Sequence, residues 1–317
     1  MNESVKDEEK HIPLISVVLC SYNGERFINK QIESILNQTV KSVEIIIVDD
    51  CSTDNTLEII KEIASLNANI KFYQNDRNLG FNKNFEKSIS FTSGEYIAIC
   101  DQDDIWLKNK LEVLLEGIGD NWLIFSNSLL IDEEDNLTGG ELLESFDLTG
   151  RTFKCILLEN FVTGHTTLFK RDFTKYILPF PNHSFYDWWL GFVALYHNKL
   201  AYINEHLTYY RVHPESVIQK EIARLLKDRN IKDKLKANQL NRQLDIFESY
   251  SMLKKEDYVF IHNLNKLCMM KDTSFKRLAF ELYMHKNVYD FYPELRKRRF
   301  FSKTRLKEAR IFAKMQF

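Results

Sequence analysis

Four short apolar segments alternate with helical patterns over the first hundred residues. They span residues 14–20, 43–49, 70–74 and 96–100, and they are rich in β-branched residues, as strands covered on both faces should be. The apolar residues between them recur at helical spacing. Because alternating strands and helices imply right-handed crossovers and a parallel sheet, the pattern predicts an α/β fold. Gly94 is expected to end the third helix in a left-handed conformation.

Acidic and small polar residues follow three of the predicted strands. The first strand leads into CSYNGERF, the second into DDCSTDNT and the fourth into DQDDIW. Ligands of open parallel sheets bind beyond the carboxyl ends of the strands, so these segments should line one site. Neither the GxGxxG of dinucleotide-binding proteins nor the Gly-rich P-loop motif is present. The rim therefore suits a hydroxyl-rich ligand and a metal ion.

The segment DQDDIW concentrates negative charge at the end of one buried strand. Asp101 and Asp103 form a DxD triplet, whose hard oxygen ligands suit Mg²⁺ or Mn²⁺ together with phosphate oxygens. A divalent ion in a partly dry cleft can stabilise a departing diphosphate. The alternative interpretation is a hydrated acidic turn.

Several motifs, taken in order, resemble glycosyltransferase family 2, a family of inverting enzymes with the GT-A nucleotide-sugar fold. They are SVVLCSYNG, EIIIVDDCSTDNT, DRNLGFNKNFE, SGEYIAICDQDD and a late YRVH. The resemblance implies a GT-A domain over residues 14–217, with a nucleotide-binding half (14–105) and an acceptor half (106–217). A tail (1–13) would precede this domain, and a basic helical extension (218–317) would follow it. CDQDDIW also resembles the corresponding segment of bacterial rhamnosyltransferase-like members.

The same resemblance implies a nucleotide site and a metal site. Asp50 would accept a hydrogen bond from the base, and the imide N–H of uracil or thymine suits a carboxylate, so a UDP- or dTDP-sugar is expected. Asp103 would be the direct ligand of Mn²⁺ or Mg²⁺, with Asp101 and His213 beside it. The other residues implied to contact the nucleotide are Ser21, Tyr22, Asn23, Glu25, Arg77, Asn78, Gly80, Asn84, Asp101 and Gln102.

An inverting transferase also needs a base that takes the proton of the acceptor hydroxyl. In HSFYDWWLGFVALY, Asp187 stands before an apolar run, where a carboxylate is favoured at the start of a helix. By its position after the DxD, Asp187 resembles the family's catalytic aspartate; a helix cap is the alternative. The family often has a second acid just before this aspartate, and here that position is Tyr186.

Five further residues are expected to contact the acceptor or the sugar: Trp106, Gly164, His165, Trp188 and Arg211. The tryptophans either stack on sugar faces or belong to the core. The histidine either lines the acceptor site or is structural. The arginine resembles a family residue near the diphosphate and the metal. The stretch from Asp132 to Gly150 is expected to be a mobile loop over the acceptor cleft.

The net charge of −2 hides two regions of opposite charge. From Ile218 to the carboxyl terminus, 24 Lys and Arg face 12 Asp and Glu. The final segment, LRKRRFFSKTRLKEARIFAKMQF, is either an amphipathic helix on an anionic membrane or an extension packed on the body or on a second subunit. No nucleic-acid motif accompanies this charge, so nucleic-acid binding is not expected.

The sequence also bears on the compartment. Its five cysteines show no CxxC spacing, and its amino terminus is acidic where a secretory signal would be basic and then apolar. No apolar run approaches the ~18 residues that a membrane-spanning helix needs. We expect a cytoplasmic protein. If the basic tail binds lipid, the protein would also contact the inner face of the plasma membrane as a peripheral protein.

The predicted function is a metal-dependent inverting glycosyltransferase. It would move a hexose or deoxyhexose from a pyrimidine nucleotide-sugar to a glycan or lipid-linked acceptor in cell-surface polysaccharide synthesis. One alternative is a non-catalytic nucleotide-sugar-binding scaffold in a synthase complex. Another is a sugar-1-phosphate nucleotidyltransferase, which would be expected to show a Gly-rich basic loop after the first strand; that loop is missing.

Overall fold

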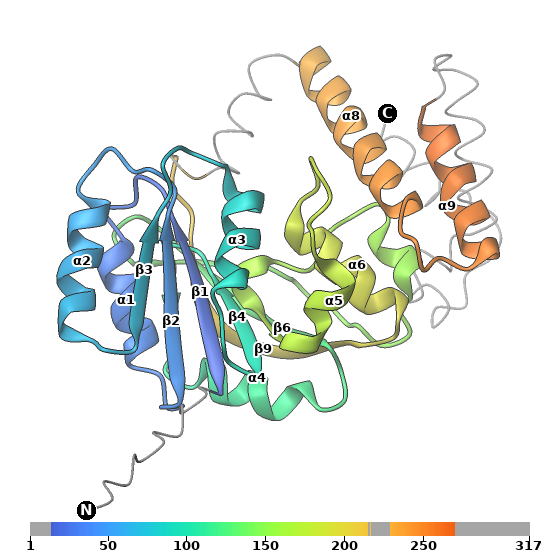
Figure 1. Cartoon of the computed structure of the whole chain (residues 1–317). Helices are drawn as coiled ribbons and strands as arrows, with labels where there is room; N and C mark the ends of the chain where they lie inside the picture. The colour runs from blue at the N-terminus through green and yellow to red at the C-terminus, as the bar shows by residue number, and fades with distance from the viewer. Residues whose placement is uncertain (1–13, 215, 217–228, 270–317) are drawn as a thin grey trace, which may run out of the picture.

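The computed structural model describes residues 14–214, 216 and 229–269 (Figure 1). Its first half is a parallel sheet in the order β3-β2-β1-β4. The strands are β1 (Ile15–Ser21), β2 (Val43–Asp49), β3 (Ile70–Gln74) and β4 (Tyr96–Cys100). The linking helices are α1 (Ile28–Leu36), α2 (Thr56–Leu66) and α3 (Phe81–Ser90). The predicted α/β fold and its four strands are confirmed, with bounds that differ by at most one residue.

Alternate side chains of β1 face two different cores. Val17 and Leu19 pack with α1, α2 and the later helix α4 (Lys110–Ile118), whereas Val18 packs with α3 and the later helix α6 (Tyr186–Tyr196) on the other face. Figure 1 shows α1 and α2 beside one face of these strands and α3 beside the other. Burial on both faces explains why the strands are almost continuously apolar.

The second half adds antiparallel pairs and extends the sheet to β8-β6-β9-β5. Antiparallel β8 lies between β4 and β6, and parallel β9 lies on the far side of β6. The strands are β5 (Ile105–Trp106), β6 (Leu123–Ile131), β7 (Leu137–Glu141), β8 (Thr167–Lys170) and β9 (Leu200–Arg211). The helices are α4 (Lys110–Ile118), α5 (Thr174–Ile177) and α6 (Tyr186–Tyr196). The pairing of β4 with β8 brings the residues just before β8 close to the loop that carries the DxD.

The structure differs from two sequence expectations, one about the end of α3 and one about a loop from Asp132 to Gly150. Helix α3 ends at Ser90 with Phe91 as its right-handed cap, so Gly94 does not end it. A Cβ atom on Gly94 would lie 2.7 Å from the backbone nitrogen of Ser16, so this glycine allows a close approach of two chain segments. The stretch from Asp132 to Gly150 contains β7, which pairs with β6 as a hairpin.

Helices α8 (Arg229–Glu248) and α9 (Lys255–Cys268) form a pair that packs on α6. Phe247 of α8 is fully buried, with its ring stacked 4.2 Å from Phe192 and edge-on to Trp188 at 5.9 Å. The described part of the carboxyl-terminal extension therefore supports the helix that carries Asp187. The basic segment at the end of the chain lies outside the described residues. Among the described helices, none combines the length and apolar character needed to cross a bilayer.

Candidate active site

The loops after β1 and β4 are joined by the side chain of Gln102. Its Oε1 accepts a hydrogen bond from the backbone N–H of Tyr22 at 2.8 Å, and its Nε2 donates to the carbonyl of Tyr22 at 3.1 Å. A Cβ atom at Gly24 would lie 2.3 Å from this Oε1, so glycine leaves room for the amide. Gln102, expected at the nucleotide, fixes the rim of the site. The ring of Tyr22 stays exposed.

Hydrogen bonds also join the loops after β1 and β2. Ser21 donates its hydroxyl to Asp49 at 3.1 Å. The side-chain carbonyl of Asn23 accepts the backbone N–H of Thr53 at 2.8 Å, and Glu25 accepts that of Asn55 at 2.9 Å. Three of the residues expected at the nucleotide thus shape the wall of the site through contacts within the protein.

Asp50 organises the segment before α3. Its carboxylate is buried and accepts the backbone N–H of Leu79 at 2.8 Å and that of Gly80 at 2.9 Å, together with the Asn75 amide at 2.8 Å. Gly80 has a φ of +79°, which favours glycine at this turn. The Oδ2 atom accepts only the Gly80 bond among the described residues, so it retains a lone pair for a further donor such as a base N–H.

Three other residues expected near the base differ in how they are placed. Asn84 is buried, where its amide donates to the carbonyl of Val48 at 3.0 Å and accepts from Asn75 at 2.9 Å. It therefore supports the pocket from behind. Asn78 is exposed and accepts the N–H of Gly80, and Arg77 is exposed beside it. An exposed guanidinium on this loop is free to meet a ligand from the solvent side.

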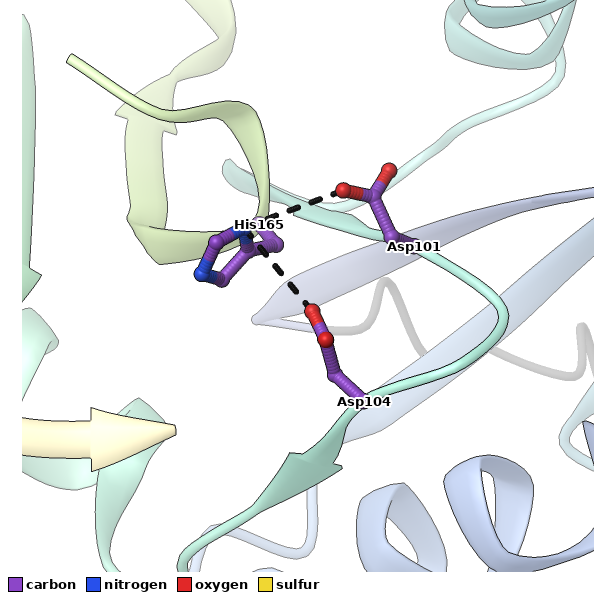
Figure 2. Close-up of side chains that lie close together, drawn as sticks. All are labelled: Asp101, Asp104 and His165. Atoms are coloured by element: carbon purple, nitrogen blue, oxygen red, sulfur yellow. Dashed lines mark ion pairs between the residues drawn. The ribbon is translucent and has the colours of Figure 1, made fainter. Parts of the chain in front are cut away.

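Asp101, Asp104 and His165 converge beyond the end of β4 (Figure 2). The two aspartates come from the loop after β4, and the histidine comes from the 3₁₀ turn Gly164–Thr166 before β8. The Nδ1 atom of His165 lies 3.7 Å from an oxygen of Asp101 and 3.8 Å from an oxygen of Asp104. Asp104 and His165 are fully buried, whereas the Asp101 side chain is 37% exposed and opens to solvent.

The protonation behaviour of this cluster follows from its burial and its charges. Burial, followed by the charges of Asp103 and Asp187, raises the pKa of Asp101 to about 7. Burial, followed by the charges of Asp103 and Asp101, raises the pKa of Asp104 well above its usual range. Burial lowers the pKa of His165 well below its usual range, so the imidazole stays neutral. Carboxylates packed this closely need a cation or a proton beside them.

The donor atoms fit a divalent metal ion. The Oδ2 of Asp104 and the Nδ1 of His165 are buried and accept no hydrogen bond from any described residue. The Nε2 of His165 lies 3.1 Å from the Ser128 hydroxyl, and a proton on Nε2 donated to Ser128 leaves a lone pair on Nδ1 for a metal. Two carboxylates and a neutral imidazole form a ligand set that suits Mn²⁺ or Mg²⁺.

The residues expected to bind the metal are divided between two groups. Asp101 belongs to the cluster just described. Asp103 pairs instead with His213, whose Nε2 lies 2.9 Å from a carboxylate oxygen of Asp103. Asp104 was not among the residues predicted from the sequence, and His165 was expected at the acceptor. The third aspartate of DQDD was the available signal for Asp104.

Arg211 is buried and holds the DxD loop to the β6–β7 hairpin. Its guanidinium donates to the carbonyls of Asp103 and Asp132, at 2.7 and 2.8 Å, and pairs with Asp135 at 2.5 Å. Its backbone N–H donates to Asp104 at 3.0 Å. The guanidinium therefore bonds to groups within the protein and positions the DxD loop. The sequence had led us to expect that it contacts the sugar.

Lys110 is a second buried cation in this region. Its ammonium donates to the carbonyl of His165 at 2.5 Å and to the Thr208 hydroxyl at 2.7 Å, and it lies 3.9 Å from the ring centre of Trp106. Burial lowers the pKa of Lys110 to about 7 against the opposing charges of Asp104 and Asp101. In the sequence it is one lysine at the start of an amphipathic helix, so no local signal distinguished it.

Asp187 lies in the first turn of α6, near enough to Asp101 for its charge to raise the pKa of that carboxyl group. Its carboxylate accepts the backbone N–H of Trp188 at 2.7 Å and is also hydrogen-bonded by the backbone of Gly164 and the side chain of Asn160. Burial raises the pKa of Asp187 to about 6, and these hydrogen bonds limit the rise. A half-buried carboxylate that loses its proton near neutral pH can act as a general base.

The two tryptophans expected to stack on sugars belong to the core. Trp106 is 3% exposed and lies under the Lys110 ammonium, and Trp188 is 8% exposed and donates to the carbonyl of Ile156 at 2.6 Å. Neither ring offers a free face to the cleft in this structure. Both tryptophans therefore agree with the alternative interpretation of the sequence, in which they belong to the core.

Residues 16–178 match the family model described as "Glycosyl transferase family 2". The chain belongs to glycosyltransferase family 2. The match covers about half of the chain and includes β1 to β4 and the DxD loop. It makes the protein a glycosyltransferase.

Curated relatives and solved structures agree with this membership. The chain is 28% identical over 221 residues to the Escherichia coli "UDP-Glc:alpha-D-GlcNAc-diphosphoundecaprenol beta-1,3-glucosyltransferase WfaP", covering 69% of this chain and 85% of the relative. S. aureus TarS 1-349 in complex with UDP-GlcNAc superposes with a TM-score of 0.54 at 17% identity, covering 94% of this chain and 90% of TarS. Mannosyltransferase PcManGT from Pyrobaculum calidifontis in complex with GDP-Man and Mn²⁺ gives 0.58 at 13% identity, covering 96% and 84%. The fold is therefore GT-A-like, a mixed and mostly parallel sheet with carboxyl-terminal helices.

Proposed function

We propose that this glycosyltransferase is a metal-dependent inverting enzyme that uses a UDP- or dTDP-sugar and acts in cell-surface polysaccharide synthesis. The observation that carries the proposal is that Asp187 lies close to the cluster of Asp101, Asp104 and His165. Its charge acts on Asp101, and its hydrogen-bond partner Gly164 directly precedes His165. A metal-ligand set beside a carboxylate of raised pKa is the arrangement that sugar transfer from a nucleoside diphosphate requires.

The donor is proposed to be a pyrimidine nucleotide-sugar because of Asp50. Its free lone pair suits the imide N–H of uracil or thymine. The name of WfaP specifies UDP-Glc and TarS was solved with UDP-GlcNAc, which supports this choice, whereas PcManGT was solved with GDP-Man. The transferred sugar is proposed to be a hexose or a deoxyhexose such as rhamnose.

The acceptor is proposed to be a lipid-linked glycan. The WfaP name specifies an acceptor linked to diphosphoundecaprenol, and this chain aligns with 85% of WfaP. A lipid-linked acceptor would bring the protein to a membrane surface from the cytoplasmic side. We propose that the basic carboxyl-terminal segment makes this contact, with packing on a second copy of the chain as the alternative role.

The chain's own residues would divide the reaction between them. Asp101, Asp104 and His165 would hold Mn²⁺ or Mg²⁺. The hydrogen-bonded pair of Asp103 and His213 would lie beside them. The ion, when bound, neutralises charge on the leaving diphosphate. Asp187 would take the proton of the acceptor hydroxyl while that oxygen attacks the anomeric carbon from the face opposite the diphosphate. Attack from that face inverts the anomeric configuration.

Thermal unfolding in the presence of nucleotides tests the donor and the metal together. We expect UDP or dTDP with Mn²⁺ to raise the melting temperature, because ligand at 100 times its dissociation constant adds about 2.7 kcal/mol to the free energy of unfolding. GDP and ADP serve as matched nucleotides that lack the pyrimidine imide. A shift with GDP equal to that with UDP would contradict the role of Asp50. A UDP shift that persists without Mn²⁺ and with EDTA would contradict the metal site.

A non-catalytic scaffold remains the second candidate function. It would show the same nucleotide-dependent shift but no release of nucleoside diphosphate in the presence of an acceptor. Asp187 has a raised pKa and a place in the cleft, which a scaffold would not need.

A further inference from the structure

Tyr186 is held rigidly at the start of α6. Its backbone N–H donates to the side-chain carbonyl of Asn82 at 3.2 Å, and its ring packs 4.6 Å from Phe85 and 5.9 Å from Phe180. The side chain is 6% exposed. A ring fixed on two sides holds its hydroxyl at one position in the cleft.

The hydroxyl of Tyr186 lies over Gly164. A Cβ atom at Gly164 would be 2.0 Å from the phenol oxygen and 2.7 Å from the ring carbon that bears it. The backbone of the same glycine hydrogen-bonds Asp187, and the next residue is His165. Gly164 therefore makes room for the phenol at the point where the metal-ligand cluster and Asp187 adjoin.

The surroundings of this hydroxyl make it a free donor. Burial raises the pKa of Tyr186 well above its usual range, and the charges of Asp101 and Asp187 add to the rise, so the phenol keeps its proton. The hydroxyl forms no hydrogen bond with any residue that the structure describes. Its oxygen is also absent from the buried, unpaired polar atoms of those residues, so solvent reaches it. A hydroxyl that solvent reaches and that no described residue accepts can donate its proton to a bound ligand.

One of the aromatic rings beside Tyr186 is exposed to solvent. Phe81, at the start of α3, is 42% exposed and lies 6.3 Å from the Tyr186 ring and 6.2 Å from Phe185. Apolar rings beside a phenol donor and a carboxylate base suit a sugar, which presents both C–H faces and hydroxyl groups. The side nearest Asp187 is the side from which an acceptor hydroxyl must reach the base.

We propose that the Tyr186 hydroxyl donates a hydrogen bond to an oxygen of the acceptor sugar, and that it determines acceptor specificity. The inference rests on the proposed function, since it needs an acceptor bound beside Asp187. A fixed donor selects acceptors that place an oxygen within its reach, because a sugar without that oxygen leaves the donor unpaired. The donor sugar and its nucleotide would be bound without it.

The test is Tyr186→Phe, which removes one oxygen and keeps the ring. We expect the KM for GlcNAc-diphosphoundecaprenol to rise about tenfold, with kcat changed by less than about threefold. The UDP or dTDP affinity and the melting temperature should not fall, since the hydroxyl bonds to no described residue. Tyr202→Phe is the matched control, because that hydroxyl bonds to the exposed Asn204 and lies outside the cleft residues; it should change none of these values.

Direct binding of the same lipid-linked acceptor to both proteins, with UDP and Mn²⁺ present, separates this inference from the proposed function. Acceptor binding that is about tenfold weaker in Tyr186→Phe supports the inference even if the wild type shows no turnover, in which case the proposed function fails alone. Turnover with equal acceptor KM and equal acceptor binding in the two proteins overturns the inference alone. A fall in kcat with a displaced pH profile and an unchanged acceptor KM would also overturn it, because Tyr186 would then act through Asp187.

Discussion

Replacing Asp187 by asparagine is expected to lower kcat by about 10²- to 10⁴-fold, the range that general bases contribute. Asparagine keeps the size of the side chain and one carbonyl oxygen, so it can still accept the N–H of Trp188. It cannot take a proton from the acceptor hydroxyl. The affinity for UDP or dTDP should stay within about twofold of the wild type, since the substitution leaves the metal-ligand cluster in place.

The pH profile gives this prediction a second readout. The pKa of Asp187 is raised to about 6, and the base works only after losing its proton. With Mn²⁺ at a saturating concentration, so that Asp101 is held deprotonated, wild-type kcat/KM should therefore rise with pH, reach half of its maximum near pH 6 and level off above it. This limb should be absent in Asp187→Asn. Asp172→Asn, at an exposed aspartate paired with Lys175, is the control and should leave the profile unchanged. Full activity in Asp187→Asn would remove the base assignment.

Replacing Asp101 by alanine is expected to weaken Mn²⁺-dependent nucleotide binding about 10- to 100-fold and to lower turnover by at least about 100-fold. Asp101 is the proposed metal ligand that is common to the sequence prediction and to the cluster with Asp104 and His165. It is also the most exposed of these side chains, so it is the one best placed to meet a diphosphate-bound ion. Calorimetric titration of UDP and dTDP with and without Mn²⁺ measures the effect.

The melting temperature of Asp101→Ala without metal gives a second test. Removing one carboxylate from a crowded cluster relieves repulsion, so the metal-free melting temperature of Asp101→Ala should not fall. Asp172→Ala provides the control for loss of a surface carboxylate. Asp101→Ala that binds nucleotide with wild-type Mn²⁺ dependence would place the metal elsewhere, and Asp103 with His213 would be the next pair to vary.

The first half of the fold was predictable because each strand and helix can be recognised from one continuous stretch of the sequence. Runs such as VEIIIVD can only be buried strands when helical patterns flank them, and the parallel order follows from the crossovers. The position of the site followed from the same logic, since the carboxyl ends of parallel strands meet at one edge.

The partners of Asp101 were not predictable in the same way. His165 reaches the cluster because the chain returns as antiparallel β8 beside β4, and Lys110 reaches it from α4. These contacts join residues far apart in the sequence, and no local pattern specifies them. Trp188 appeared to be a sugar platform because the sequence does not show that α8 covers α6 and places Phe247 against it.

The most direct test of the account is the anomeric configuration of the product of wild-type transfer. A pyrimidine nucleotide-sugar, a lipid-linked acceptor and Mn²⁺ are combined, and the new linkage is read by NMR coupling constants. The account predicts one nucleoside diphosphate released per glycosylated acceptor, an anomeric configuration opposite to that of the donor, and no product when EDTA replaces Mn²⁺. Retained configuration, or nucleotide binding without any transfer, would contradict it.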